Sequence, residues 1–243
     1  LEIKDAGKKL IQVSDNGQGI PADEIALAVT RHATSKLSKA EDLFDIRTLG
    51  FRGEALASIG SVAKLSIISK HHQAELGAEI SVDGGKSDGV KAKSAPIGTI
   101  VRVEDLFFNV PARLKFLKSD LTENRQITGL ITRYALAYPH IRWQLIQDGR
   151  VYLQTTGSGD RQEILQSLFG TNDAKRLLPI HFEDSGIQVE GFISELSLTR
   201  SNRRDITLFI NGRWVQDSSL TAAVIRAYHT MLMVGRFPVV VLF

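Results

Sequence analysis

The 243-residue sequence contains no cysteine, and this absence removes several kinds of chemistry. Without thiols the chain has no disulfide bridges, no thiolate metal sites and no cysteine nucleophile. Long apolar runs are missing as well, since no stretch approaches the ~20 residues that a membrane span requires. We therefore expect a protein whose partners do not include a membrane.

The chain also has only a small excess of positive over negative charge. The 30 Lys and Arg residues stand against 27 Asp and Glu, which leaves a formal net charge of +3 at pH 7. This balance permits a nucleic-acid partner but is only a weak argument for one. Hydrophobic residues make up 43% of the chain and charged residues 23%, so a sizeable core is expected.

Apolar runs separated by turn residues predict strands mixed irregularly with helices. Asp5-Ala6-Gly7 and Asp148-Gly149 each lie between two strand-like runs, and a helix is predicted to begin at Pro21. The small polar segment Thr155-Thr156-Gly157-Ser158-Gly159 predicts a linker. We expect mixed α+β layers, with one domain at residues 1–155 and a second at 156–243.

Both ends of the sequence suggest a fragment. The chain begins at Leu1, without an initiator Met, in a strand-like run, and it ends at Phe243 inside another apolar run. We expect the parent protein to continue on both sides.

The first candidate site is the turn Asp15-Asn16-Gly17-Gln18-Gly19, which follows an apolar strand. An Asp carboxylate at a strand end can accept a hydrogen bond from an exocyclic amine such as that of adenine. Gly17 and Gly19 allow the backbone to approach a planar base without a Cβ clash. Because Asp, Asn and Gly are common turn residues, an ordinary turn is an equally good interpretation of this segment alone.

The second candidate is the segment Gly50-Phe51-Arg52-Gly53-Glu54-Ala55-Leu56. A glycine-marked turn that leads into a helix presents backbone N–H groups and the positive end of the helix dipole, which suits phosphates. Arg52 adds a positive charge. The alternative is a plain turn with Arg52 paired to an acid, and the pattern matches neither the Walker motif nor a Rossmann fingerprint.

Two further pieces complete the pattern. Between the glycine-marked segments, Thr34, Ser35 and Lys36 concentrate hydroxyl and ammonium donors in a predicted flexible loop. Such a loop can form a lid over a triphosphate, although a solvated basic loop is the alternative. Thr99, at the start of a predicted strand, can place its hydroxyl beside the same base; alone it would be an ordinary β-branched strand residue.

In this order the segments resemble the GHKL ATPase superfamily and, within it, the MutL family of DNA mismatch repair proteins. The closest correspondence lies in Arg31-His32-Ala33-Thr34-Ser35-Lys36, in the Gly50 to Leu56 segment and in residues 105–117. Another superfamily member, such as a topoisomerase subunit or a chaperone, is the alternative that the Arg31 to Lys36 segment opposes.

The resemblance implies a Bergerat-type ATP-binding α/β sandwich at residues 1–155 and a smaller ribosomal-S5-domain-2-like α+β domain at 156–243. It also implies roles for individual residues. Asp15 would bind the adenine amino group with Thr99 and water nearby, and Gly17 and Gly19 would shape the base pocket. The ATP lid would contain Thr34, Ser35 and Lys36, and the phosphates would be held by Gly50, Phe51, Arg52, Gly53, Glu54, Ala55 and Leu56.

ATP and Mg²⁺ are the implied cofactors. The family's general base, a Glu, and its Mg²⁺ ligand, an Asn, would both precede Leu1, and a Lys that reaches the γ-phosphate would follow Phe243. We therefore expect an ATPase as the parent protein and little or no hydrolysis by this chain alone, because water activation needs a base close to the nucleophile.

The implied partners are a second MutL-type subunit joined by ATP-driven dimerisation, a mismatch-recognition protein, and DNA bound without sequence preference. Arg203, Arg204 and Arg213 are the candidate DNA contacts, and a solvated basic loop is the alternative. Aromatic residues do not alternate with these arginines, so no base-stacking surface is expected. The expected compartment is the bacterial cytoplasm near the nucleoid, or the nucleus of a eukaryote. A nucleotide-gated scaffold that does not hydrolyse ATP is the alternative function.

Overall fold

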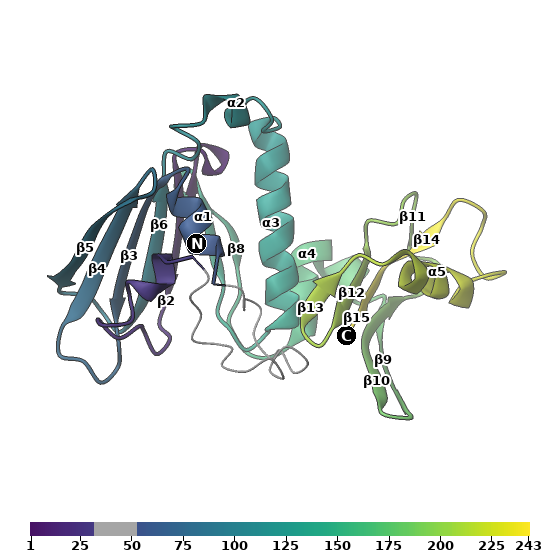
Figure 1. Ribbon diagram of the computed structural model, residues 1–243. Coiled ribbons are helices and arrows are strands. Elements are labelled where there is room, and N and C mark those ends of the chain that lie inside the picture. The colour runs from purple at the N-terminus through teal and green to yellow at the C-terminus, as the bar shows by residue number, and fades with distance from the viewer. Residues whose placement is uncertain (32–52) are drawn as a thin grey trace. The chain divides into compact units, whose positions relative to one another are not determined.

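A computed structural model describes residues 1–31 and 53–243, which form two compact units (Figure 1). The first unit comprises residues 1–128 and 144–154, and the second comprises residues 129–143 and 155–243. The boundary proposed at residues 155 and 156 adjoins the break after Gln154, whereas residues 129–143 group with the second unit. In the described residues no helix is long and apolar enough to cross a membrane.

The first unit is built on an eight-stranded sheet in the order β5-β4-β3-β6-β2-β1-β7-β8. Its neighbouring strands are antiparallel, except that β1 runs parallel to β7. The strand bounds are β1 Glu2–Lys4, β2 Leu10–Asp15, β3 Lys64–Lys70, β4 Gly77–Asp83, β5 Lys86–Lys93, β6 Gly98–Glu104, β7 Gln144–Gln147 and β8 Arg150–Gln154. Both expected hairpins are present, and η1 (Asp5–Gly7) forms the first of them.

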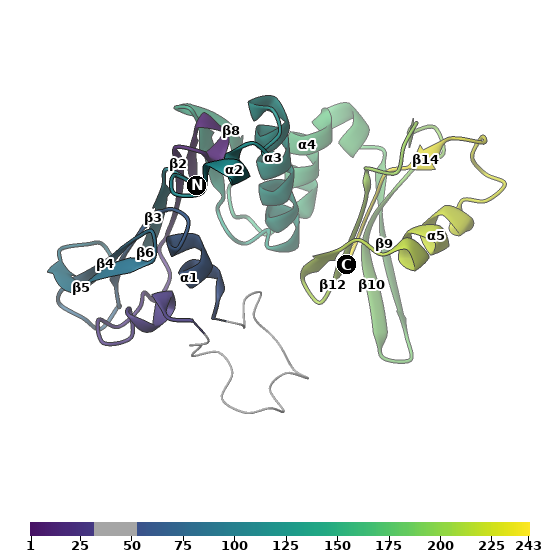
Figure 2. The same ribbon diagram turned by 45° about the horizontal axis from the view of Figure 1, so that its top comes forward.

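One face of this sheet carries the core of the first unit. Helix α1 (Ala55–Gly60) and the 3-10 helix η2 (Leu27–Val29) pack there (Figure 2). Ile25, Leu65 and Ile67 are among the core side chains and are at most 2% exposed. Helix α3 (Asp120–Ala137) contributes its first half to this unit, where the Gln147 amide donates hydrogen bonds to Asn124 O and Thr128 Oγ1.

The prediction of a helix that begins at Pro21 is wrong. The segment instead forms turns and then η2, with backbone hydrogen bonds such as Leu27 N to Glu24 O that join residues three apart. A segment this short does not repay the entropy of α-helix nucleation. Ile25 in this segment is 0% exposed and anchors it in the core of the first unit.

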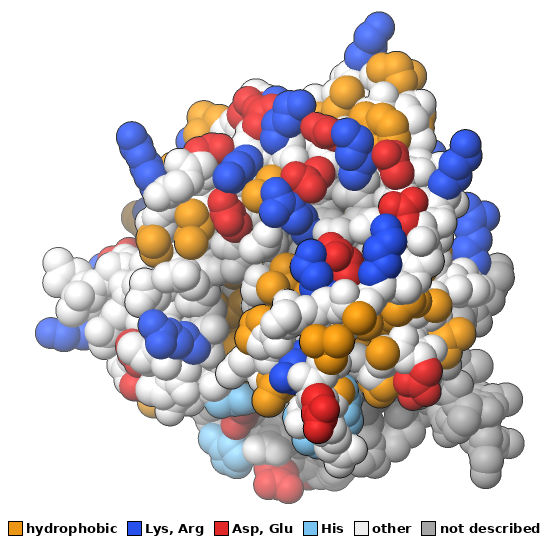
Figure 3. All heavy atoms as spheres, turned by 90° about the vertical axis from the view of Figure 1, so that its left-hand side faces the viewer, with side chains coloured by type: hydrophobic (Ala, Val, Ile, Leu, Met, Phe, Trp, Pro, Cys, Tyr) orange, Lys and Arg blue, Asp and Glu red, His pale blue; other side chains and the backbone are white. Residues whose placement is uncertain are grey.

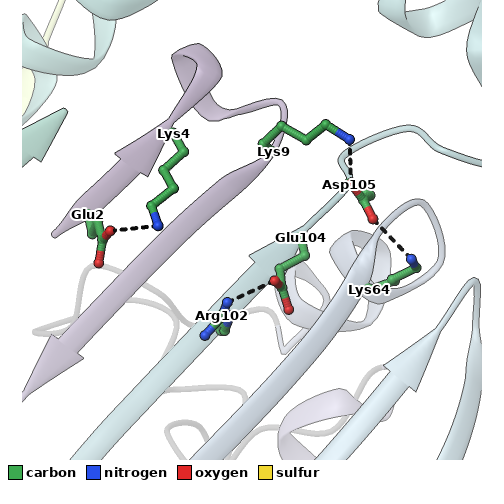
Figure 4. Close-up of polar contacts among 7 residues, drawn as sticks. All are labelled: Glu2, Lys4, Lys9, Lys64, Arg102, Glu104 and Asp105. Carbon is green, nitrogen blue, oxygen red and sulfur yellow. Dashed lines mark hydrogen bonds and ion pairs between the residues drawn. The ribbon is translucent and has the colours of Figure 1, made fainter. Parts of the chain in front are cut away.

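The other face of the sheet is charged, and its charges are mixed in sign (Figure 3). Ion pairs join Glu2 to Lys4, Arg102 to Glu104, and Asp105 to both Lys9 and Lys64 (Figure 4). Hydrogen bonds from the Lys64 and Lys9 ammonium groups lower the pKa of the Asp105 carboxyl. Exposed pairs such as these contribute little to stability. The groups that form these pairs already have a partner of opposite charge, which makes them poor candidates for holding a charged ligand.

The second unit contains a five-stranded sheet in the order β13-β12-β15-β10-β9 and a separate pair, β11 with β14. The bounds are α4 Arg161–Ala174, β9 Leu177–Asp184, β10 Ile187–Ser194, β11 Thr199–Arg200, β12 Ile206–Ile210, β13 Arg213–Val215, α5 Ser218–Ala227, β14 Phe237–Pro238 and β15 Val240–Leu242. The central strand β15 is buried, with Val240 and Val241 at most 1% exposed. The short helix α2 (Pro111–Leu114) belongs to the first unit.

Backbone contact between β10 and β15 leaves no room for a side chain at Gly191. A Cβ on this residue would lie 2.1 Å from Val241 O, at a φ of +144°. Gly186, in the turn between β9 and β10, has a φ of +79° and open space around it. A substitution at Gly191 therefore adds a steric clash to an unfavourable backbone conformation, whereas a substitution at Gly186 tests the unfavourable conformation alone.

We predict that Gly191→Ala lowers the free energy of unfolding by about 3 kcal/mol or more, whereas Gly186→Ala costs about 1 kcal/mol. Urea denaturation of both variants measures the difference. Equal losses would show that β10 and β15 can separate to admit a methyl group.

Candidate functional site

The register of β2, β6 and β3 places their side chains in rows on the core face of the sheet. Two apolar rows run across the three strands: Ile11, Val103 and Leu65, then Val13, Val101 and Ile67. The third row in the same register is polar and consists of Asp15, Thr99 and Ser69. Because side chains alternate along a strand, all three rows lie on one face. The apolar floor therefore ends in a line of one carboxylate and two hydroxyls, which we call the polar row.

Ser69 connects the polar row to the loop that follows β2. Its hydroxyl is 2.8 Å from Ile20 N, which donates to it, and 2.9 Å from Thr99 Oγ1. It also donates to Gly98 O at 3.0 Å. The residue is 1% exposed, so these bonds satisfy a polar group inside the core.

Asp15 lies at the end of β2 and is exposed. Its Oδ1 accepts a hydrogen bond from Gly17 N at 2.9 Å, which orients the carboxylate. Among the described residues no donor contacts Oδ2. The side chain thus offers a fixed acceptor at the edge of the apolar floor, where Val13 is 39% exposed.

Two glycines bring backbone segments into direct contact around the polar row. A Cβ on Gly19 would lie 2.0 Å from Lys70 O, and one on Gly98 would lie 2.1 Å from Asp15 O. Their φ angles are +75° and +115°, which L side chains rarely adopt. The turn predicted at residues 15–19 is therefore fixed against the end of β3, and Gly17 supplies the N–H for Asp15.

The structure places only part of the second predicted segment. Gly53 has a φ of +63° and leads into α1, with Glu54 at the N-cap position and Ala55 as the first helical residue. Leu56 packs against the core on the same face as the polar row. The remaining predicted residues of this segment and of the lid lie outside the described residues: Thr34, Ser35, Lys36, Gly50, Phe51 and Arg52.

Arginines gather in the second unit, but they differ in their partners. Arg200 forms ion pairs with Asp205 at 2.8 Å and with Asp173 at 3.0 Å. The hydrogen bond with Asp173 is the main cause that raises the Arg200 pKa. Arg203 and Arg204 instead line a cavity of about 440 Å³. Arg213 begins β13, the strand that follows the turn at Asn211-Gly212.

The cavity in the second unit also contains residues that the sequence did not identify. Its lining consists of Arg133, Arg203, Arg204, Ile206, Thr207, Leu208, Trp214, Val215, Gln216, Asp217, Ser218 and Thr221. Arg133 comes from α3 and places its guanidinium 4.0 Å from the centre of the Trp214 ring. Nothing in the linear order of the sequence relates these two residues.

Ser69 is the other functional residue that was missed, and here a signal was present. Leu65, Ile67 and Ser69 occupy alternate positions of one strand, and all three are buried. A serine at the third buried position of such a strand indicates a hydroxyl with an internal partner. In the described residues no group of three or more His, Asp or Glu is placed to hold a metal ion.

Comparison with known proteins gives concordant matches. Residues 165–243 match the family model described as DNA mismatch repair protein, C-terminal domain. The chain is 44% identical over 242 residues to the DNA mismatch repair protein MutL of Streptococcus equi subsp. zooepidemicus and 45% identical to that of Streptococcus pneumoniae. Both matches cover 100% of this chain, which spans 37% of the length of these curated relatives.

Solved structures agree with this match. The Aquifex aeolicus MutL ATPase domain complexed with ADP is 32% identical, with a TM-score of 0.70, over 99% of this chain and 80% of that one. The N-terminal domain of a DNA repair protein is 29% identical, with a TM-score of 0.77, over 99% and 76%. The predicted α+β fold class, a GHKL-type layer followed by a smaller α+β domain, is confirmed.

We predict that Ser69→Ala lowers the free energy of unfolding by about 2 kcal/mol, because the partly buried Ile20 N–H loses its acceptor and the Thr99 hydroxyl and Gly98 carbonyl lose a partner. Ser66→Ala, on the opposite face of β3, is the matched control and should change stability by less than about 0.5 kcal/mol. Chemical denaturation of both variants measures this difference. If the two substitutions were equivalent, the polar row would not hold the loop after β2.

Proposed function

The chain belongs to the MutL family of DNA mismatch repair proteins, and from this premise we propose that its first unit binds ATP at the polar row. The observation that carries the proposal is the exposed carboxylate of Asp15 at the end of an apolar floor, with Oδ1 held by the Gly17 N–H and no described donor on Oδ2. A neighbour that is 32% identical to this chain has been solved with ADP.

The geometry of the polar row fits an adenine base. Oδ2 of Asp15 would accept a hydrogen bond from the exocyclic amine, and the Thr99 hydroxyl would reach the base through water. The exposed part of Val13 would pack on one face of the ring. Gly19 and Gly98 let neighbouring backbone segments pack directly against each other, which would fix the walls of the base pocket.

The phosphates would lie toward the N-terminus of α1, where Gly53, Glu54, Ala55 and Leu56 present the start of the helix. We propose that Gly50, Phe51 and Arg52 complete this cradle and that Thr34, Ser35 and Lys36 supply further donors to the phosphates. Mg²⁺ bound to the phosphates would neutralise part of their charge. Holding and orienting the nucleotide is the task of this chain's own residues.

For the whole protein we propose an ATP-hydrolysing clamp of DNA mismatch repair. ATP binding would drive two copies of the N-terminal region together, and hydrolysis would reset them. A mismatch-recognition protein and DNA would be its partners, and repair in the bacterial cytoplasm or a eukaryotic nucleus would be its setting. The family relationship and the ATPase domains among its structural neighbours support this proposal.

We predict that Asp15→Asn abolishes detectable ATP binding by the full-length gene product. Gly17 N–H would retain the remaining oxygen, so the new amide NH₂ would face the adenine amine, donor against donor. An unpaired donor of this kind costs about 1–3 kcal/mol, and loss of the charge adds to it. Isothermal titration calorimetry with ATP measures the affinity.

Asp88→Asn is the control, because it makes the same change of charge on the exposed strand β5. It should leave ATP affinity unchanged. ATP affinity of Asp15→Asn equal to that of the unmodified protein would sink the assignment of the base pocket.

For the second unit we propose sequence-independent DNA binding through Arg203, Arg204 and Arg213. Arg203 and Arg204 border one cavity, whereas the neighbouring Arg200 is engaged with two carboxylates. The sequence match of residues 165–243 to a DNA mismatch repair family supports a role in this process.

We predict that replacing these three arginines with Glu reduces DNA retention at low salt. The slope of log K against log salt is negative, and each lost phosphate contact should make it less steep by about 0.9. Reversal of Lys86, Lys91 and Lys93 on β5 makes the same change of net charge in the first unit and is the control. Equal losses of DNA retention in both triple variants would show that the effect comes from net charge and not from these three arginines.

A further inference from the structure

The cavity of the second unit holds three arginines whose charges have no carboxylate partner among the described residues. Arg133, Arg203 and Arg204 form no ion pair with the described residues, whereas three other arginines of this unit do. Arg161 pairs with Glu190, Arg176 with Asp173 and Glu195, and Arg200 with Asp173 and Asp205. The cavity therefore brings together three guanidinium groups that have no carboxylate partner among the described residues.

The one acidic residue in the lining does not neutralise them. Asp217 is the N-cap of α5, and its carboxylate accepts a hydrogen bond from Leu220 N at 2.8 Å. Burial lowers the pKa of the Arg133 guanidinium, which means that its charged form is partly desolvated without a compensating anion. An anionic ligand in the cavity would offset that desolvation and the repulsion between the three cations.

Tertiary structure also brings aromatic rings to these arginines, which the order of the sequence did not suggest. The Arg133 guanidinium lies 4.0 Å from the centre of the Trp214 ring, and that of Arg203 lies 5.1 Å from the centre of Phe237. Trp214 belongs to β13, the edge strand of the five-stranded sheet. A cation on one side fixes the indole, so its remaining surface can meet a planar ligand without loss of side-chain freedom.

We propose that this cavity takes one nucleotide of a single-stranded DNA segment, with the phosphate on Arg203 and Arg204 and the base on Trp214. Arg133 is the positioning residue that holds the indole. The volume of about 440 Å³ is within the range of pockets that enclose small molecules. A base in a duplex stays stacked between its neighbours, so an unpaired base is what enters a concave site. This inference rests on the DNA binding proposed above.

An acidic peptide is the competing ligand, because its carboxylates would also suit three arginines. The aromatic ring argues against an acidic peptide, because a carboxylate gains no favourable interaction with the face of an indole. Base–aromatic stacking, by contrast, is the common means by which proteins hold single strands.

Fluorescence polarisation tests the proposal with the full-length gene product, a short labelled single-stranded oligonucleotide and the duplex of the same sequence. Trp214→Leu should lower single-strand affinity roughly tenfold and change duplex affinity by less than about twofold. Trp214→Phe keeps a ring over Arg133 and should restore most of the affinity. Tyr152→Leu, which removes a 57% exposed aromatic from β8 of the first unit, should have no effect.

Three results would overturn the inference. One is single-strand affinity that is unchanged in Trp214→Leu. A second is an equal loss for both DNA forms in that variant with no rescue by Trp214→Phe. A third is displacement of the oligonucleotide by polyglutamate at equal charge concentration. If the triple arginine reversal still weakens DNA retention in any of these cases, the DNA-binding proposal stands and only the nucleotide pocket fails.

Discussion

The hydrogen bonds of the Ser69 hydroxyl determine the geometry on which the first unit depends. This one buried group joins the Ile20 N–H, the Gly98 carbonyl and the Thr99 hydroxyl, and so ties the loop after β2 to the ends of β6 and β3. The strand register then places Asp15, Thr99 and Ser69 side by side, because they are paired across three adjacent strands. A slip of one residue in any of these strands would turn its polar residue to the opposite face.

The two faces of the large sheet divide the work of folding and binding. On one face, apolar rows bury their side chains beneath α1 and η2 and end in the polar row. On the other, carboxylates and amines pair with one another, as Asp105 does with Lys9 and Lys64. Groups paired in this way are already compensated and offer little to a charged ligand. The carboxylate of Asp15 is exposed and oriented by one N–H, and its second oxygen has no donor among the described residues, so it is the acceptor that we propose for the ligand.

The second unit shows the same contrast among its arginines. Arg200 is held between Asp173 and Asp205 and contributes to packing. Arg133, Arg203 and Arg204 surround a cavity instead, with Trp214 beside them. Helix α3 reaches this cavity through Arg133, and Tyr138, which follows the helix, donates a hydrogen bond to Gly212 O at the turn before β13. Arg133 and Tyr138 thus hold the strand that carries Arg213 and Trp214 through contacts within the second unit.

The sequence by itself determined the family and most of the strands. The order of the motifs from Asp15 to Thr99 can be read directly along the chain and identifies the family. Alternation of apolar residues predicts strands, because successive side chains of a half-buried sheet point alternately to the core and to solvent. Tertiary structure alone decided which polar groups meet. Ser69 joins Thr99 and Ile20 through strand pairing, and Arg133 reaches Trp214 through helix packing. Residue spacing along a chain carries no record of such pairings, since they arise only when distant segments bury their apolar surfaces together.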